Sequence, residues 1–148
     1  MKRLEPVSKI MSKDLITLGL SDNLYTAEKL FKESHIRHIP VVEDEHIIGM
    51  LSLSDLKRIS FLDAYDANEV QIDNAIYNML SIEQIMVKNS IRVDVNTTIK
   101  SVAEILSKNE FHALPIVDDN ILVGIVTTTD LLKYLLDQYE LETKNGAI

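Results

Sequence analysis

Gly49-Met50-Leu51-Ser52-Leu53-Ser54-Asp55-Leu56 returns 75 positions later (124 minus 49) as Gly124-Ile125-Val126-Thr127-Thr128-Thr129-Asp130-Leu131. The glycine, the aspartate and the last leucine are identical, and hydroxyl residues stand three positions and one position before the aspartate in both stretches. A stretch that returns in this form indicates one structural unit written twice, and two copies are too few for a solenoid. We therefore expect two domains that bury one shared surface, as an internal pseudo-two-fold pair.

The match extends outward from these stretches without a gap, so that residues 7–56 align with residues 82–131. Many other pairs exchange one apolar side chain for another, which indicates that the two copies have the same core. We predict a first domain over 1–60, an acidic helical connector over 61–81, and a second domain with a C-terminal helix over 82–148. The identical pairs are Ile10/Ile85, Met11/Met86, Lys13/Lys88, Ile16/Ile91, Pro40/Pro115, Val42/Val117, Asp44/Asp119, Gly49/Gly124, Asp55/Asp130 and Leu56/Leu131.

Each copy has the pattern of a strand, a helix, two strands and a helix, which predicts the α/β class with β-α-β-β-α order. In the first copy, Ile16, Leu18 and Leu20 alternate as in a half-buried strand. Ser21 and Asp22 then supply N-cap chemistry for a helix. The apolar face of that helix repeats at three- and four-residue steps. Its residues are Leu24, Ala27, Leu30 and Phe31, matched by Ile99, Val102, Ile105 and Leu106.

Two apolar runs around an acidic turn predict the pair of strands in each copy. The turn is Glu43-Asp44-Glu45 in the first copy and Asp118-Asp119-Asn120 in the second. Asp55 and Asp130 then each predict the N-cap of a final helix. The second of these helices carries a wide apolar stripe that needs a partner, and closed two-fold pairing is the commonest oligomer, so we expect a homodimer. The stripe consists of Leu131, Leu132, Leu135, Leu136 and Tyr139.

Composition and charge disfavour or exclude several classes of protein. The 148 residues are 46% hydrophobic and 26% charged, with a formal net charge of −8 and no cysteine. Disulfides, thiolate metal sites and cysteine nucleophiles are therefore excluded, which fits a reducing compartment. An acidic chain disfavours nucleic-acid binding, which depends on basic patches. We see neither an apolar run long enough for a membrane span nor the apolar stretch of a signal peptide in residues 1–10. We expect a cytoplasmic protein that binds neither nucleic acid nor a membrane.

Three stretches in each copy resemble the cystathionine-β-synthase-type (CBS) domain. In the first copy they are Val7-Ser8-Lys9-Ile10-Met11, Ile36-Arg37-His38-Ile39-Pro40-Val41-Val42 and residues 49–56. In the second copy they are residues 82–86, Phe111-His112-Ala113-Leu114-Pro115-Ile116-Val117 and residues 124–131. Together the copies are similar to a tandem CBS pair, or Bateman module, over nearly the whole chain. Each CBS domain of that family has a β-α-β-β-α core, the order that the residue patterns predict independently.

The resemblance implies a regulatory binding module that has no catalytic residues and requires no cofactor. Its ligand would be an adenine nucleotide (AMP, ADP or ATP) or S-adenosylmethionine, held in clefts between the paired domains. Ligand occupancy would be signalled through dimer geometry to a regulated protein partner. In the family, the aspartate and the hydroxyl residues before it contact the ribose and phosphate. These roles carry over to Ser52, Ser54 and Asp55 in one cleft and to Thr127, Thr129 and Asp130 in the other.

This carry-over agrees with simple chemistry, but the same residues have a second interpretation. An ionised carboxylate accepts hydrogen bonds and suits two ribose hydroxyls, and a helix N-terminus offers N–H groups to a phosphate. Asp, Ser and Thr are, however, preferred N-caps in any protein. Both interpretations stay open, and one residue can serve both roles. We interpret Gly49 and Gly124, which lie within the expected strands, as positions of close packing.

The cations expected to face a phosphate differ between the copies. Arg37 and His38 stand where the family often has a basic residue, whereas the second copy has His112 and Ala113 there. This difference predicts one stronger phosphate site, or one cleft that accepts a less anionic ligand.

A further cation stands on the first expected strand of the second copy. The backbone of this strand brackets the adenine in the family. Arg92 stands here where the first copy has Thr17, and it could restore positive charge to a cleft.

Other functions are less well supported by the sequence. His35 and His38 have a spacing that could bring two imidazoles together, but no carboxylate stands at a fitting distance along the chain, so we expect no metal site. A glycine-rich phosphate loop, a Gly-x-Ser-x-Gly elbow and a His-Glu-x-x-His motif are all missing from the sequence. Two alternatives stay open: a constitutive interaction scaffold without a ligand, and a small nucleotide-processing enzyme that would need Asp55.

Overall fold

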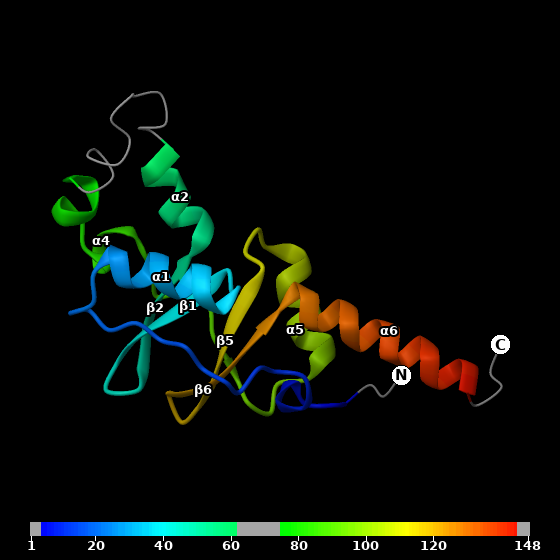
Figure 1. The fold of residues 1–148 in the computed structure, drawn as a ribbon. Helices are drawn as coiled ribbons and strands as arrows, with labels where there is room; N and C mark the ends of the chain where they lie inside the picture. Colours follow the sequence, from blue (N-terminus) through cyan, green and yellow to red (C-terminus); the bar gives the residue numbers. More distant parts are fainter. Residues whose placement is uncertain (1–3, 62–74, 145–148) are drawn as a thin grey trace. The chain divides into compact units, whose positions relative to one another are not determined.

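The computed structural model describes residues 4–61 and 75–144 and divides the chain into two compact units. We call Ile16–Ser90 the central unit. Met1–Leu15 together with Ile91–Ile148 form the terminal unit. Figure 1 labels the helices and strands of both units.

The central unit is built on a hairpin of two antiparallel strands. β1 (His38–Glu43) pairs with β2 (His46–Ser52), which also pairs antiparallel with the short β3 (Val87–Lys88). On the free side of β1, Leu18 forms a parallel bridge to Val41. The helices of this unit are α1 (Leu24–Ser34), α2 (Leu53–Phe61), residues 75–79 and α4 (Ile82–Ile85). The core contains Leu18, Leu24, Ala27, Phe31, Ile39, Val41, Leu51, Leu56, Tyr77, Ile82 and Met86.

The terminal unit repeats this plan. β5 (Ala113–Asp118) pairs antiparallel with β6 (Ile121–Thr127) and parallel with β4 (Val93–Asp94). The helices are η1 (Val7–Lys9), α5 (Ile99–Lys108) and α6 (Thr128–Lys144). The core contains Val7, Val93, Val102, Leu106, Leu114, Ile116 and Val126. The second copy has the full β-α-β-β-α order, and in the first copy the single bridge at Leu18 takes the place of the first strand. The elements confirm the predicted α/β class.

The opening segment of each copy packs in the unit built on the other copy. In the terminal unit, the Val7 N–H donates to Thr97 O at 2.7 Å, and Ser12 exchanges two backbone hydrogen bonds with Ile125 of β6. In the central unit, residues 82–88, which align with residues 7–13, form α4 and then β3. β3 pairs with β2. The predicted boundaries at 1–60 and 82–148 follow the repeat, whereas the compact units divide the chain at 15/16 and 90/91. The reason is that each opening segment forms backbone hydrogen bonds with the other copy, including its second hairpin strand.

Two matched methionines explain the glycines within β2 and β6. A Cβ atom at Gly49 would lie 2.5 Å from Met86 Sδ, and one at Gly124 would lie 2.8 Å from Met11 Cγ. A methionine of the opening segment thus occupies the space above each glycine, which confirms the packing interpretation.

The start of α1 differs from its prediction by one residue. The N-cap is Asn23, whose side chain accepts from the Thr26 N–H at 2.9 Å, and not Ser21 or Asp22. Asp22 instead closes a turn, because its carboxylate accepts from the Gly19 N–H at 2.7 Å. This turn also limits the strand expected over residues 16–20 to the single bridge at Leu18.

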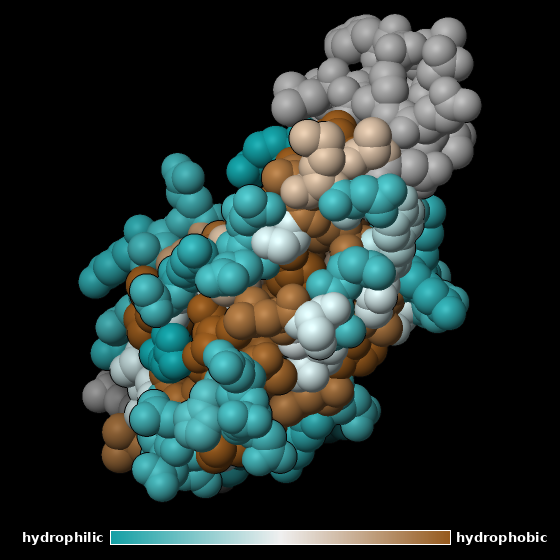
Figure 2. All heavy atoms as spheres, turned by 90° about the vertical axis from the view of Figure 1, so that its left-hand side faces the viewer, coloured by the Kyte–Doolittle hydropathy of each residue, from teal (hydrophilic) through white to brown (hydrophobic). Residues whose placement is uncertain are grey.

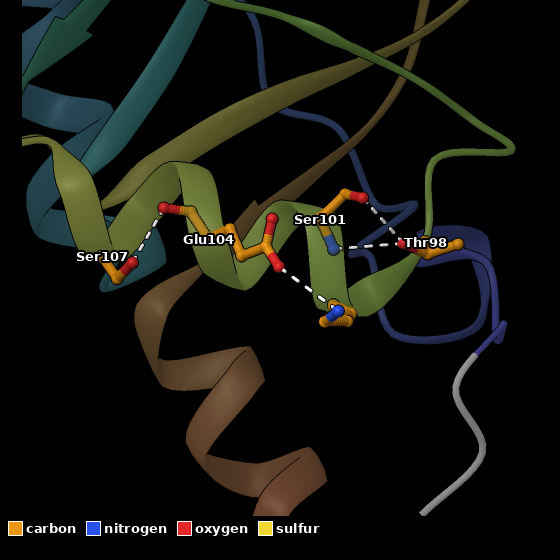
Figure 3. A network of polar contacts seen from close by, with 5 residues as sticks. Thr98, Ser101, Glu104 and Ser107 are labelled. Atoms are coloured by element: carbon orange, nitrogen blue, oxygen red, sulfur yellow. Dashed lines mark hydrogen bonds and ion pairs between the residues drawn. The ribbon is translucent and has the colours of Figure 1, made fainter.

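The matching N-cap of α5 is Thr98, at the position that aligns with Asn23. Figure 3 shows its hydroxyl accepting from the Ser101 N–H at 3.1 Å and donating to Ser101 Oγ at 2.9 Å. Further along the helix, Lys100 Nζ lies 3.6 Å from Glu104 Oε1, and the Glu104 backbone carbonyl accepts from the Ser107 hydroxyl. The two copies therefore begin this helix at equivalent positions.

Both predicted turns form two-residue hairpin loops with left-handed backbone. The φ values are 50° at Asp44 and 69° at Glu45, and 52° at Asp119 and 66° at Asn120. Two consecutive residues with positive φ match the right-handed twist of the strands that they join.

Glu5 attaches the N-terminal segment to α6 within the terminal unit. The Tyr134 hydroxyl donates to one oxygen of the Glu5 carboxylate, and Lys9 Nζ lies 3.2 Å from the other. Burial and this hydrogen bond to a carboxylate raise the pKa of Tyr134 to about 12. The contact therefore joins a neutral tyrosine to the Glu5 carboxyl group at physiological pH.

Apolar side chains remain exposed on both units. Figure 2 shows an apolar area in the middle of one face, bordered by hydrophilic side chains, on the side where Figure 1 places α1 and α4. In the terminal unit, α6 has no buried residue among its 17. Residues 62–74 of the predicted connector lie outside the described residues, and residues 75–79 form a helical turn. None of the described helices has the length and hydropathy of a membrane span.

Candidate functional site

The hairpin of the central unit brings five of the predicted binding residues to one end of β1 and β2. His38 lies opposite Ser52 in the β1/β2 register. The Arg37 carbonyl accepts from the Leu53 N–H at 2.8 Å, so Arg37 lies beside the start of α2. Asp55 and Ser54 belong to the first turn of that helix. We call Arg37, His38, Ser52, Ser54 and Asp55 the central cluster.

Ser52 and Asp55 form a reciprocal cap at the start of α2. The Ser52 N–H donates to Asp55 Oδ2 at 3.0 Å, and the Asp55 N–H donates to Ser52 Oγ at 3.0 Å. This is the capping-box arrangement, in which two N–H groups at a helix start are satisfied by side chains. The capping interpretation is therefore confirmed. The cap residue, however, is Ser52, and Asp55 is the third residue of the helix.

The cap leaves part of the cluster directed to solvent. The Asp55 side chain is 15% exposed, and its second oxygen, Oδ1, lies 3.8 Å from Arg58 Nη1. Arg37 and Ser54 are exposed, and His38 is half-buried. Thr17 precedes the Leu18–Val41 bridge by one residue, so it lies alongside β1 and is itself exposed. Hydroxyl, carboxylate and guanidinium groups thus share one end of the hairpin.

The terminal unit has the same arrangement at the matching positions. Ala113 lies opposite Thr127, and the His112 carbonyl accepts from the Thr128 N–H at 3.0 Å. The Thr127 N–H donates to Asp130 Oδ2 at 2.8 Å, and the Asp130 N–H donates to Thr127 Oγ1 at 3.2 Å. We call His112, Thr127, Thr129 and Asp130 the terminal cluster.

Arg92 lies in the terminal unit directly before β4. Val93 pairs with Ile116 in the parallel β4/β5 ladder. Arg92 precedes Val93 and is half-buried, on the side of β5 opposite β6. It therefore occupies the place in the terminal unit that Thr17 has in the central unit.

The backbone donors at the two helix starts are partly committed to the fold. At α2, the N–H groups of Leu53 and Asp55 donate to Arg37 O and Ser52 Oγ. At α6, those of Thr128 and Asp130 donate to His112 O and Thr127 Oγ1. A helix N-terminus binds a phosphate through N–H groups that have no other acceptor. The structure reduces the number of donors that remain for such a contact.

Two polar contacts at these clusters were not predicted from the sequence. Arg58 follows Asp55 by three residues, the spacing at which helix side chains are neighbours, so the pair could have been recognised. Thr128 Oγ1 lies 3.3 Å from the His112 carbonyl, and no local spacing reveals a contact between residues so far apart in the chain.

The spacing of His35 and His38 does not lead to a metal site in the described residues. His35 ends α1 in the left-handed conformation, with φ 54°. Across residues 4–61 and 75–144, no three His, Asp or Glu side chains lie close enough together to hold a metal ion. His35 and His38 are thus not part of a larger ligand group in these ranges.

Comparison with known proteins identifies the family of this fold. The family model described as CBS domain matches residues 7–61 and again residues 82–137. The uncharacterized protein MJ1225 of Methanocaldococcus jannaschii is 32% identical over 132 residues, which are 88% of this chain and 43% of that protein. The inosine-5′-monophosphate dehydrogenase of Thermoplasma acidophilum is 26% identical over 88% of this chain and 24% of the enzyme. This chain therefore spans less than half the length of each of these curated relatives.

Solved structures agree with the family match. The crystal structure of MJ1225 has a TM-score of 0.75 at 26% identity and covers 91% of this chain and 49% of that one. The CBS domain pair of protein MJ0100, in complex with 5′-methylthioadenosine and S-adenosyl-L-methionine, has a TM-score of 0.74 at 26% identity and covers 91% and 98% of the two chains. With two matches to the family model and the α/β class of both copies, the chain belongs to the CBS domain family.

Proposed function

We propose that this chain is a regulatory module that binds an adenine nucleotide or S-adenosylmethionine at the central and terminal clusters. Ligand occupancy changes the geometry of a homodimer, and a partner protein responds to that change. The mechanism is linkage, because a ligand that binds one arrangement more tightly shifts the population toward it.

The observation that carries the proposal is the recurrence of one polar arrangement in both units. A carboxylate, two hydroxyl residues and a preceding basic residue lie at the same end of each hairpin, at equivalent positions. A cap alone requires the Ser52–Asp55 type of pair, but it does not require Ser54, Thr129 or a basic residue beside the helix start. The likeness to the ligand-bound MJ0100 pair supports an adenosyl ligand here as well.

The two clusters differ in charge, and this supports unequal ligand preferences. Arg37 and His38 accompany the central cluster, whereas His112 and Ala113 occupy these positions in the terminal cluster. A guanidinium binds phosphate through several N–H donors and stays charged at any physiological pH. The central cluster is therefore the better candidate for a phosphorylated ligand, and the terminal cluster for a less anionic one.

The test is thermal unfolding of the purified chain with AMP, ADP, ATP, S-adenosylmethionine or 5′-methylthioadenosine. At a free concentration of about one hundred times the dissociation constant, a ligand stabilises by about 2.7 kcal/mol. This corresponds to a rise in Tm of about 5 to 10 °C for a chain of this size. Asp55→Asn and Asp130→Asn remove the charge that would accept the ribose hydroxyls while keeping an oxygen for the cap. Each is expected to abolish the ligand-induced rise for its own cluster.

A variant with a weakened cap elsewhere provides the control. Asn23→Ala removes the N-cap of α1, which lies outside both clusters, and should lower the Tm of the free protein. Its ligand-induced rise, measured against its own free form, should equal that of the wild type. A flat response of the folded wild type to every ligand would refute the proposal and favour a constitutive scaffold. Formation of product from ATP or AMP would instead identify an enzyme.

A further inference from the structure

One face of α6 is apolar and exposed along most of the helix. Leu132, Leu136 and Tyr139 are 56%, 61% and 61% exposed. Leu131, Tyr134 and Gln138 lie on another face, where the helix packs toward its own unit, and these three are half-buried. Figure 1 shows the later turns of α6 continuing beyond α5 and β6. The apolar face therefore has no cover within the described residues of the terminal unit.

The exposed residues follow the spacing of a helix-pair seam. Leu132, Leu136, Tyr139 and Thr143 are separated by four, three and four residues, which places them on one stripe at a and d positions of a heptad pattern. At 1.5 Å per residue the stripe is about 17 Å long. We call these four residues the α6 stripe.

Two opposite charges border the α6 stripe on the same side. Lys133 and Glu140 are seven residues apart, so they occupy equivalent e positions, and both are exposed. When two such helices pair antiparallel, e positions face e positions across the seam. Lys133 of each copy then faces Glu140 of the other, so two ion pairs form at once. In a parallel pair each e residue faces the g residue that stands five positions earlier in the other helix. Lys133 would then face Thr128 and Glu140 would face Leu135, so neither charge would meet an opposite charge.

We propose that α6 binds α6 of a second copy of this chain in an antiparallel pair. In this pair Leu136 packs beside Tyr139 of the second copy, and Leu132 packs beside its Thr143. The self-complementary charge pattern selects a second copy over an unrelated partner, because a two-fold axis turns one Lys-Glu sequence into two matched pairs. The inference rests on the homodimer of the proposed function and specifies one contact in it. It does not depend on the ligand.

The expected association is modest. One pair of helices about 17 Å long buries less than the roughly 1,600 Å² of a standard stable interface. If α6 is the main contact, the dimer should dissociate on dilution, so sedimentation velocity should be measured from about 10 μM to 1 mM.

Charge reversal tests the pairing. Lys133→Glu places two glutamates opposite each other at both ends of the seam, and Glu140→Lys places two lysines there. Each variant should weaken dimerisation about tenfold, since two exposed pairs change from attraction to repulsion. The double variant Lys133→Glu/Glu140→Lys restores opposite charges and should restore the wild-type dissociation constant. Lys144→Glu, the same change on α6 outside the e positions, should leave it unchanged.

Introduced cysteines report the direction of pairing, because the chain has none of its own. Under mild oxidation, Leu132→Cys mixed with Thr143→Cys should give disulfide-linked dimers, whereas either variant alone should stay unlinked. Linked dimers from either variant alone would show parallel pairing and overturn the proposal. A wild-type dimer that is insensitive to all charge reversals would also overturn it and leave the homodimer of the proposed function intact. A protein that is monomeric at 1 mM would refute both the pairing and the homodimer, while the ligand response is measured separately.

Discussion

At the scale of single residues, the two glycines within β2 and β6 show how closely the repeat controls packing. Each lies under a methionine from the opening segment that packs in the same unit. A methionine is long and unbranched, so it fills an irregular gap, but it cannot give way completely in a packed core. The absence of a side chain at Gly49 and Gly124 is therefore a requirement of packing.

Gly49→Ala and Gly124→Ala should each lower the free energy of unfolding by about 1 to 3 kcal/mol, because the new methyl group displaces a methionine side chain. Urea titration followed by circular dichroism measures this change. Gly19→Ala is the control, since the nearest atom to a Cβ there, Asp22 Oδ2, is 3.8 Å away. It should change stability by less than about 0.5 kcal/mol. Equal effects at all three positions would contradict the packing argument.

The residues of the two clusters were proposed from the resemblance to the CBS family, and the repeat aligned them between the copies. The sequence did not show which residue of each pair is the N-cap. An aspartate three residues after a serine or threonine fits either an N-cap of its own or the last position of a capping box. The choice depends on where the helix begins, and hydrogen bonds from Leu53 and Thr128 to carbonyls just before β1 and β5 decide this start. Those carbonyls, of Arg37 and His112, lie 16 residues earlier in the chain, beyond the reach of a local pattern.

At the scale of elements, the hairpin turns carry backbone conformations that suit some residues better than others. Asp and Asn adopt the left-handed region more readily than other residues with a side chain, and Glu has no such preference. Glu45, with φ 69°, is therefore a strained position in the β1/β2 turn, whereas its counterpart Asn120, with φ 66°, is not.

Glu45→Gly should raise the free energy of unfolding by about 1 kcal/mol, since glycine has no Cβ to clash in this conformation. Asn120→Gly at the matching position should gain less, because asparagine already tolerates it. The melting temperatures of the two variants, compared with the wild type, measure the difference. A larger gain at Asn120 than at Glu45 would show that backbone strain is not the cause.

The order of elements was predictable, and their ends were not. Apolar periodicity identified both hairpins and the helices α1 and α5, because burial of one face needs a regular spacing. The start of α1 was misplaced because Ser21, Asp22 and Asn23 are all good caps, and only the turn that binds Asp22 to Gly19 decides among them. The alignment of Asn23 with Thr98 was the one signal that favoured the right residue.

At the scale of the whole molecule, the exchange of opening segments separates the repeat from the folding unit. The sequence could not show this exchange. Val7 and Ile82, like Met11 and Met86, are alike in the two copies, so either segment would fit either hairpin by its residue types. The structure resolves the choice by placing each segment on the hairpin of the other copy.

Matched core substitutions test this assignment. Val7 and Ile82 align in the repeat, and both are fully buried. Val7→Ala should destabilise by on the order of 2 kcal/mol and speed amide hydrogen exchange in β5 and β6, because Val7 belongs to the terminal core. Ile82→Ala should instead speed exchange in β1 and β2. Mass spectrometry of the exchanged peptides distinguishes the two patterns, and the opposite pattern would support units that follow the repeat.

The exchanged segments also decide what happens when the chain is cut between its copies. The N-terminal fragment then holds β2 without β3, together with a segment whose pairing partner, Ile125, is on the other fragment. The C-terminal fragment holds the converse. Each half lacks a piece that the other half carries, so neither is a complete domain, and the two are complementing fragments in the sense used for split-protein reporters. Co-expression of both halves, and not of one alone, is therefore the condition under which this fold can be divided.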